Sequence, residues 1–400
     1  MSTHLIQFCM KTSFKKIFFG ACALTLMAGV YVTPTNSFAA SSEELHKKKT
    51  HTNHRDPVVF RFSSFGDSRT ALNVADITPQ DKKWLINSPV LTRIDREIAQ
   101  YHPNAMVYVG DMVMGYTKDK TQLEREYGYW RGLTSNLLES GTYVFPAPGN
   151  HETQIPTKTA EGKTVKLAQA DLEQAYRENM ADLVIDQDRW QRINPHLTLS
   201  AFDPKNTPTA ELDGAKSDQS LLTYSFDIEH VHFSIVNTDS VGADSTVSAS
   251  WLRRDFEAAK ARGVKAFVVF GHKMAFEYVP EGSNKRDGDG LEMYPDQRDA
   301  FWSVIEEYGA TYFCGHQHIF HASQPWKSQG GESWQVIVGS GGAPLNVKPG
   351  ESKNPKDRMY AWANVTVYAS GTLGVKVWGF DAPTARTQLL ETWTIKPAKT

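Results

Sequence analysis

Cysteine is scarce in this sequence. The 400 residues contain three cysteines, Cys9, Cys22 and Cys314. The first two lie in a segment that we expect to be removed, so the mature chain keeps only Cys314. A single cysteine forms no internal disulfide, which excludes the class of small secreted domains stapled by disulfides. Because Cys314 lies in the apolar run ATYFCGH, we expect it to be a buried core thiol.

An excess of charge of either sign is also missing. The chain carries 43 Lys and Arg against 45 Asp and Glu, a net charge of −2. Charge alone would therefore hold neither nucleic acid nor an anionic membrane, and we expect no nucleic-acid partner. The hydrophobic content of 40% and the charged content of 22% are ordinary for a globular protein. The length suffices for one large domain or two modest ones.

The apolar run at residues 17–32 falls short of the ~20 residues that cross a bilayer. Lysines precede this run, and small residues at 37–40 offer a cleavage site for a signal peptidase. This order is typical of a secretory signal peptide. We predict a signal peptide over residues 1–40 and an exported protein, periplasmic or secreted, that keeps no stable membrane anchor after cleavage.

The polarity of the sequence after the signal peptide divides it into a leader, a domain and an insertion within that domain. Residues 41–57 are polar and lack apolar periodicity, which predicts a flexible leader. Residues 58–400 are assigned to one domain. Within it, residues from about 153 to 220 hold one predicted helix, 166–184, and a stretch rich in Pro and Asp. We interpret 153–220 as an insertion over the site and not as a separate domain.

Alternating strands and helices fill the first half of the domain, and strands dominate its end. Apolar runs predict strands at 58–67, 105–111, 142–152, 264–273 and 310–318. Helical spacing predicts helices at 79–103 (split near Pro89), 121–140, 250–263 and 296–309. Residues 221–239 predict a β-hairpin that turns near Glu229, with His230 and His232 exposed beside the turn. The whole pattern predicts an α/β fold in which sheets pack in layers with helices outside.

Five predicted strands end in Gly followed by an ionisable or amide side chain: FGD, VGD, PGNH, FGH and CGHQH. Side chains gathered at strand ends of an α/β sheet mark the expected site. A lone Gly-Asp is more often a turn, but five such blocks in order are a specific signal. We expect each Gly to let the backbone turn sharply. The candidate site residues are Asp67, Asp111, Asn150, His151, His272, His316 and His318.

Two carboxylates, one amide oxygen and several imidazoles form a mixed oxygen and nitrogen set that suits first-row divalent metals. The set is too large for one ion and about right for two, which need a bridging carboxylate when they lie ~3.5–4 Å apart. We expect His316 and His318 to point to the same side, because residues two apart on a strand share a face.

The ordered blocks GD, GD, GNHE, GH and GHQH resemble those of the calcineurin-like metallophosphoesterases, a superfamily that includes purple acid phosphatases and phosphodiesterases. The resemblance covers most of the mature chain except 153–220. It implies a layered β-sandwich flanked by helices (αββα) and two divalent or mixed-valence metal ions, Fe, Mn or Zn. In detail it implies that Asp67 and His318 hold the first ion. Asp111 would bridge the two ions, and the second would be held by Asn150, His272 and His316.

The sequence departs from the family pattern at two positions. Many members have Asp-x-His in the first block, whereas this chain has Arg69, which offers no lone pair to a metal. Three residues after Asp111 stands Met114, where purple acid phosphatases have Tyr; Tyr116 is near but at the wrong spacing. We expect the first ion to be held more weakly than the second. Arg69 is either a phosphate clamp or the partner of a neighbouring carboxylate.

The resemblance implies hydrolysis of a small-molecule phosphoester by a metal-activated water, with His151 as proton donor to the leaving group. A phosphate monoester is the expected substrate, and a diester is the alternative on the same site. Two readings of other classes stay open: a serine esterase that uses Ser68 of GDS, and a non-catalytic binding protein. The loop 277–296 is expected to form a rim that touches substrate. The sequence indicates no oligomeric state.

Overall fold

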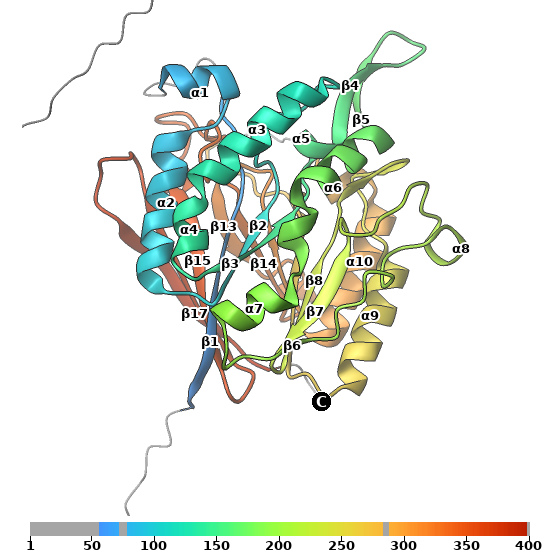
Figure 1. The fold of residues 1–400 in the computed structure, drawn as a ribbon, viewed down its shortest axis with the longest axis vertical. Helices are drawn as coiled ribbons and strands as arrows, with labels where there is room; N and C mark the ends of the chain where they lie inside the picture. The colour runs from blue at the N-terminus through green and yellow to red at the C-terminus, as the bar shows by residue number, and fades with distance from the viewer. Residues whose placement is uncertain (1–55, 72–77, 283–287, 398–400) are drawn as a thin grey trace, which may run out of the picture. The chain divides into compact units, whose positions relative to one another are not determined.

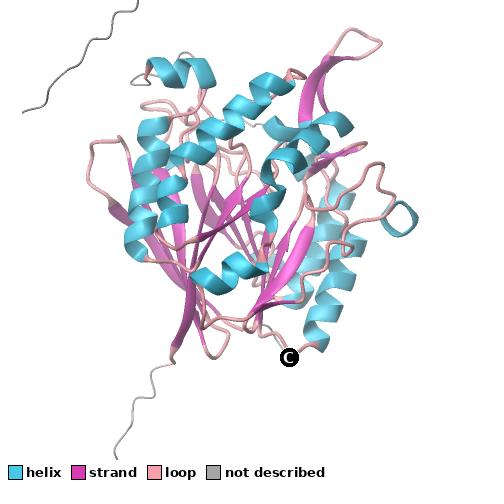
Figure 2. Ribbon diagram, viewed as in Figure 1, coloured by secondary structure: helices cyan, strands magenta, loops and turns pink. Residues whose placement is uncertain are grey.

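Two mixed β-sheets packed face to face form the centre of the structure (Figure 1, Figure 2). The computed structural model describes residues 56–71, 78–282 and 288–397. The predicted signal peptide and nearly all of the predicted leader lie outside the described residues. Among those described, no helix has both the length and the apolar character that crossing a membrane requires.

The first sheet has the strand order β17-β16-β15-β1-β2-β3. Three of its strands run parallel, β1 (Val58–Phe65), β2 (Ala105–Val109) and β3 (Tyr143–Ala147). The C-terminal strands β15 (Tyr360–Tyr368), β16 (Leu373–Phe380) and β17 (Gln388–Ile395) extend it antiparallel.

The second sheet has the order β13-β14-β12-β11-β8-β7-β6. Its parallel strands are β8 (Val231–Ile235), β11 (Ala266–Phe270), β12 (Thr311–Cys314) and β14 (Trp334–Val338). Its antiparallel strands are β6 (Leu199–Ser200), β7 (Tyr224–Ile228) and β13 (Phe320–Ser323).

Alternation along the strands explains why both faces of each sheet are covered. In β11, Val268 and Phe270 point into the core between the sheets, whereas Phe267 and Val269 pack under the outer helices. Burying one such side chain stabilises the fold by roughly 1.5–3 kcal/mol. Continuous apolar strands of this kind are expected where a parallel sheet is buried on both faces.

Helices cover the outer face of each sheet (Figure 2). Against the first sheet lie α2 (Ser88–Tyr101), α3 (Lys120–Leu133), α4 (Ser135–Glu139) and α6 (Ala170–Val184), whereas α1 (Pro79–Trp84) contacts α3. Against the second lie α9 (Ala249–Ala261) and α10 (Pro295–Tyr308). The expected αββα layering is confirmed.

The predicted break near Pro89 is present but lies earlier in the chain. Helix α1 ends at Trp84, and Leu85 takes a left-handed conformation. Asn87 then caps α2 through its side chain, which accepts from the backbone N–H of Val90. Pro89 falls in the first turn of α2, where its missing N–H costs nothing.

Residues 153–220 begin with a hairpin of β4 (Gln154–Lys158) and β5 (Thr164–Ala168), followed by α6, α7 (Gln187–Ile193), β6 and α8 (Ala210–Asp213). The predicted helix 166–184 was wrong at its start, because 164–168 pairs as a strand. Helix α6 buries Leu172 and Tyr176 with the outer core of the first sheet. That these residues are an insertion stays a prediction.

Two further expectations were wrong. The predicted hairpin forms as β7 and β8, but His232 is fully buried under α9 because the second sheet is covered on that face as well. Strand β12 ends at Cys314, so His316 and His318 lie in a loop and do not share a strand face. The expected burial of Cys314 is confirmed.

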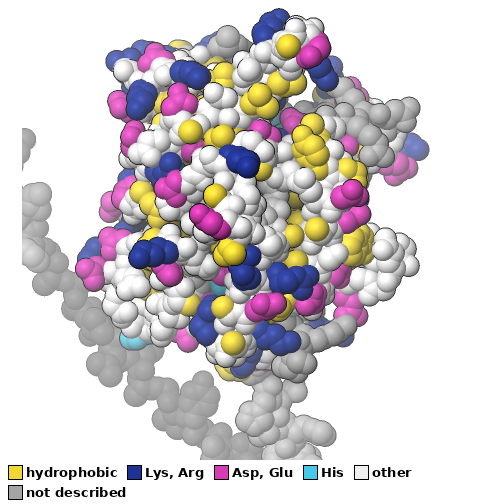
Figure 3. Space-filling view, turned by 90° about the vertical axis from the view of Figure 1, so that its right-hand side faces the viewer, with side chains coloured by type: hydrophobic (Ala, Val, Ile, Leu, Met, Phe, Trp, Pro, Cys, Tyr) yellow, Lys and Arg dark blue, Asp and Glu magenta, His cyan; other side chains and the backbone are white. Residues whose placement is uncertain are grey.

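Positive and negative side chains are interspersed over the face drawn in Figure 3, with no large area of one sign. This distribution agrees with the net charge of −2. It offers no track for a polyanion on that face.

Candidate metal centre

The candidate site lies where the carboxyl ends of parallel strands from both sheets meet. Asp67, Asp111 and Asn150 follow β1, β2 and β3 of the first sheet. His272 and His316 follow β11 and β12 of the second sheet. The structure therefore brings together blocks that are up to 249 residues apart in sequence, as the contact between His316 N–H and Asp67 shows. A site is expected at this edge of an α/β fold.

Three of the candidate ligands have strained backbones. Asp67, Asp111 and His316 have φ angles of 63°, 54° and 67°. Non-glycine residues rarely adopt such values, and they concentrate at functional sites.

We expected the glycine of each site block to let the backbone turn sharply, but most of these glycines have a different role. Only Gly110 has a positive φ, of 86°; the others serve mainly to leave room. A Cβ at Gly315 would overlap Asp67 Oδ2, and one at Gly271 would come within 2.7 Å of the Tyr312 hydroxyl.

Four donor atoms form a cage for one cation. His272 Nε2 lies 2.9 Å from Asn150 Oδ1 and 3.1 Å from Asp111 Oδ1. His316 Nδ1 lies 2.9 Å from Asn150 Oδ1 and 3.3 Å from His272 Nε2. Ligands about 2.1 Å from an ion lie about 3.0–3.4 Å from one another in octahedral or tetrahedral geometry. These four separations suit neighbouring ligands of one first-row cation, with His272 Nε2 next to Asp111, Asn150 and His316.

A second set of donors adjoins this cage. The other oxygen of Asp111, Oδ2, lies 3.1 Å from Arg69 Nε, and Asp67 Oδ1 is 3.6 Å from His318 Nε2. Asp67 is fully buried, yet its Oδ1 accepts no hydrogen bond from the residues that the structure describes. Ligand atoms of Asp67, Asp111 and His272 lie within 4.8 Å of one another. A buried carboxylate oxygen without a donor fits a cation.

Arg69 contacts two members of this second set. Its Nε donates to Asp111 Oδ2 at 3.1 Å, and its Nη2 lies 3.0 Å from His318 Nε2. His318 Nδ1 is 2.7 Å from the carbonyl oxygen of Pro344, which only accepts, so Nδ1 carries the proton. Nε2 therefore keeps its lone pair and accepts from Arg69. Of the two roles expected for Arg69, the structure shows the ion pair with a neighbouring carboxylate, Asp111.

Burial and neighbouring charges set the protonation of the ligands. Burial, reinforced by Arg69, lowers the pKa of His318 to about 3. Burial also holds the pKa of His316 well below its ordinary value. Both imidazoles are thus in the neutral form that binds metal. Burial would lower the pKa of His272 as well, but Asp111 and Asp67 outweigh it and raise that pKa to about 10.

His151 lies beside this centre and is oriented by the backbone. Its Nδ1 is 2.6 Å from the carbonyl oxygen of Met114, and its Nε2 is 3.7 Å from Asp111 Oδ2. The ring packs on Tyr116 with centroids 3.9 Å apart. We expected Tyr116 to be at the wrong spacing for the site, but its hydroxyl accepts a hydrogen bond from Asn150 Nδ2. This contact turns Asn150 Oδ1 toward the cage.

Sequence reasoning missed Glu152, although it stands in the GNHE block. Its carboxylate accepts from the backbone N–H groups of Asp111, Val113 and Gly149 at 2.9, 3.1 and 2.7 Å. Burial and the charge of Asp111 raise its pKa to about 7. Glu152 ties the loops after β2 and β3 together and so positions Asp111.

Lys273 was also missed. Its buried ammonium lies 2.8 Å from Asp239 Oδ1 and 2.9 Å from Asp289 Oδ1. Asp289 Oδ2 in turn lies 3.8 Å from His316 Nε2. Its position directly after His272 was the feature of the sequence that could have identified it as a neighbour of the site.

Ser68 does not suit the role of a nucleophile. Its side chain is fully buried, and its hydroxyl donates to the carbonyl oxygen of Met112 at 3.0 Å. His230, which an esterase would need, instead donates from Nε2 to the carbonyl oxygen of Tyr368 at 3.0 Å.

Solved structures share the fold. A purple acid phosphatase from yellow lupin (Lupinus luteus) seeds superposes with a TM-score of 0.52 at 15% identity, over 86% of this chain and 54% of that chain. PhoD superposes with a TM-score of 0.50 at 11% identity, over 86% and 70%. A dimetal phosphatase from Danio rerio has a TM-score of 0.49 at 12% identity, over 85% and 99%.

This chain spans about half the length of the lupin enzyme. No family model matches the sequence, and no curated protein does. The chain shares its fold with a purple acid phosphatase and with PhoD.

Proposed function

We propose that this chain is a metal-dependent phosphoesterase that hydrolyses phosphate monoesters at a centre of two cations. The observation that carries the proposal is the cage of Asp111, Asn150, His272 and His316, in which neighbouring donor atoms lie 2.9–3.3 Å apart. The shared fold with phosphatases supports the same class of reaction.

The donor set indicates which cations to expect. Carboxylate, amide and imidazole ligands suit Fe, Mn or Zn better than Mg or Ca, which prefer oxygen alone. Bound in this cage, such an ion supplies Lewis-acid chemistry that polarises a phosphoryl oxygen and activates water. Asp111 Oδ1 lies next to His272 and Oδ2 next to Arg69 and His151, so this carboxylate would be the one to bridge two cations.

The side chains around the centre would bind and orient the phosphate. Arg69 contacts Asp111 and His318 and is 16% exposed at its side chain, so part of it is open to solvent. A guanidinium donates to two phosphate oxygens at once. His151 Nε2 faces the same centre, and we assign this ring to the leaving-group oxygen. Because its Nδ1 donates to the Met114 carbonyl and burial holds the pKa of His151 well below its ordinary value, Nε2 has to take up a proton, for example from the attacking water, before it passes one to the leaving group.

The proposal is tested on purified mature protein. Removing metal with a chelator should abolish hydrolysis of p-nitrophenyl phosphate, and added Mn²⁺, Zn²⁺ or Fe²⁺ should restore it. A serine esterase would keep its activity in chelator and would cleave p-nitrophenyl acetate. A non-catalytic protein would bind metal and turn over neither compound.

Two parts of the proposal need separate measurements. Bis-p-nitrophenyl phosphate compared with the monoester tests monoester against diester preference through the ratio of kcat/KM values. N-terminal sequencing of protein recovered from cells tests export, with cleavage near residue 40 expected. Retention of residues 1–40 would contradict the predicted signal peptide.

A further inference from the structure

A pocket of about 680 Å³ adjoins the metal centre. Lys273 and Asp289 line it, and Asp289 Oδ2 lies 3.8 Å from the candidate ligand His316. The volume is in the range of small-molecule sites. A substrate phosphate at the metals would therefore direct the rest of the molecule toward this pocket.

Exposed apolar side chains gather at this pocket. Among the described residues, six large hydrophobic side chains stay exposed, and three of them line it: Leu167 (39% exposed), Met293 (49%) and Tyr294 (45%). Leu167 comes from β5; Met293 ends the 3₁₀ turn Leu291–Met293 in the predicted rim loop, and Tyr294 follows it. Apolar side chains left exposed together beside a site indicate a ligand with an apolar surface.

The charged groups of the pocket are largely paired with one another. Lys166 Nζ lies 3.8 Å from Asp289 Oδ2. Asp244 accepts from Gln154 Nε2 at 2.8 Å and from the backbone N–H of Ala168 at 2.7 Å. The pocket therefore does not offer an excess of positive charge for a second phosphate. It offers an apolar surface with a polar border, to which the exposed Gln297 contributes.

The pocket wall is continuous with the reacting side of the centre. Lys166 places its ammonium 5.0 Å from the ring centroid of Tyr116, and that ring packs on His151. The β4–β5 hairpin thus lies next to the residue assigned to the leaving group. A leaving alcohol beside His151 would meet β5.

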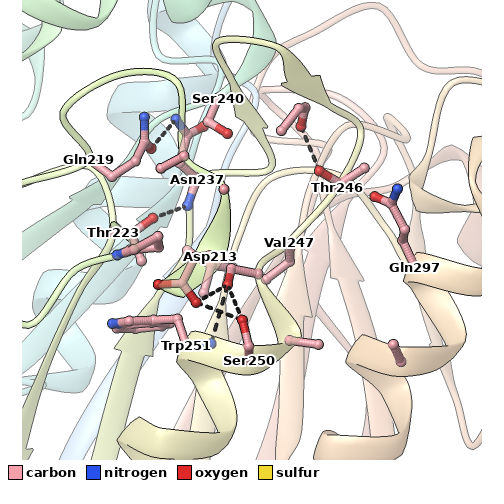
Figure 4. Close-up of a pocket in the computed structure, with 18 residues that line it drawn as sticks. Asp213, Gln219, Thr223, Asn237, Ser240, Thr246, Val247, Ser250, Trp251 and Gln297 are labelled. Atoms are coloured by element: carbon pink, nitrogen blue, oxygen red, sulfur yellow. Dashed lines mark hydrogen bonds between the residues drawn. The ribbon is translucent and has the colours of Figure 1, made fainter. Parts of the chain in front are cut away.

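A second pocket, of about 400 Å³, is less suited to the substrate (Figure 4). Its polar groups bond to each other: Asp213 accepts from Ser248 and Ser250, and Gln219 accepts from Asn237. None of the candidate metal ligands lines either pocket. The larger pocket has the contact of Asp289 to His316, whereas no residue that lines the smaller one has a hydrogen bond or ion pair to a candidate ligand among the described residues.

We propose that the pocket beside His316 binds the alcohol part of the substrate, and that this part carries a flat aromatic or heteroaromatic ring. The inference rests on the proposed function for the position of the phosphate. Leu167 and Tyr294 supply the apolar contacts to the ring faces, and the polar border meets the ring substituents. A nucleoside and a phenol both have this chemistry.

The test compares ring-bearing and ringless monoesters. Wild-type protein should hydrolyse adenosine monophosphate or phosphotyrosine with a kcat/KM at least about tenfold above that for glycerol phosphate, because ring stacking is lost with glycerol. Tyr294→Ala and Leu167→Ala should each lower kcat/KM for the ring-bearing ester about tenfold and lower that for glycerol phosphate far less, so that the ratio of the two values falls. The two ring-bearing esters decide between a nucleoside and a phenol.

Leu389→Ala is the matched control, since Leu389 is 46% exposed on the edge strand β17 and does not line the pocket. Calorimetry with adenosine and with tyrosine, which carry no phosphate, tests the ring-binding pocket independently of the proposed phosphoesterase activity. Ring binding that is lost in Tyr294→Ala supports the pocket even if no ester is hydrolysed. Equal hydrolysis of all three esters by wild type and both variants would overturn the pocket while leaving the proposed function intact.

Discussion

The guanidinium of Arg69 and the imidazole of His318 meet at one lone pair. Arg69 Nη2 lies 3.0 Å from His318 Nε2, and the hydrogen bond of Nδ1 to Pro344 leaves Nε2 as the acceptor. The same lone pair is the one that would bind the first cation. Arg69 and that cation therefore compete for His318, and Arg69 also pairs with the carboxylate of Asp111.

Metal titration tests this competition. Apoprotein titrated with Mn²⁺ or Zn²⁺ should bind one ion tightly and a second more weakly. Arg69→Ala should tighten the second step, because it frees His318 and Asp111. Metal content after dialysis, measured by mass spectrometry, reports both steps. Arg253→Ala, which removes an exposed arginine paired with Glu307, is the control. Equal affinity of both steps in wild type would contradict the competition.

Arg69→Ala should also weaken the binding of phosphate if the guanidinium acts as a clamp. Charged hydrogen bonds contribute about 1.5–3 kcal/mol, so the inhibition constant of inorganic phosphate should rise roughly 10–100-fold. The measurement is made at saturating metal, so that metal loss does not enter. An unchanged inhibition constant, Michaelis constant and turnover would leave Arg69 as the partner of Asp111 alone.

Separate substitutions of the two histidines test the division of ligands between the ions. His316→Ala removes a donor of the four-atom cage and should lose the tight ion and nearly all hydrolysis. His318→Ala should lose only the weak ion. Metal content of the two variants, measured side by side, checks this. Loss of the tight ion from His318→Ala would show that the assignment of the two sites is reversed.

The layered fold was predictable because it rests on local patterns. Alternation in β1 and the apolar run of β11 are readable in sequence, since each side chain is buried by the face on which it lies. The site blocks were readable for the same reason, as each follows a strand. His232 was misread, because its burial depends on α9, which packs on it from a different part of the chain.

The contacts within the site depend on loop conformation, which the sequence pattern does not fix. The strand expected through His318 stops at Cys314, and the positive φ of His316 turns the loop instead. Tyr116 reaches Asn150 because the loop after β2 folds back over α5 (Asn150–Thr153). Residue spacing in the sequence predicts neither the end of the strand at Cys314 nor the contact between Tyr116 and Asn150.

Gly315→Ala tests whether space between the sheets positions Asp67. The added methyl group would overlap Asp67 Oδ2 and displace the carboxylate. A displacement near 1 Å should reduce kcat roughly 10–100-fold. Gly128→Ala is the control, because Gly128 lies in α3 with no neighbour near its missing methyl group. Circular dichroism of both variants confirms folding, and a fully active Gly315→Ala protein would show that Asp67 tolerates the shift.

The buried His232 should make stability depend on pH above neutrality. Its Nδ1 lies 2.6 Å from Asp227 and its Nε2 2.8 Å from Asp255, so only the protonated ring donates to both. Burial opposes the charge, but the two carboxylates outweigh it and raise the pKa to about 9. A folded-state pKa above the ordinary 6.5 stabilises the fold fully below pH 6.5. That stabilisation, on the order of 2–3 kcal/mol, declines between pH 6.5 and 9. Urea unfolding at pH 6 and pH 9.5 should show this loss in wild type and in His196→Gln, an exposed control, but not in His232→Gln. The same loss in His232→Gln would assign the pH dependence to another group.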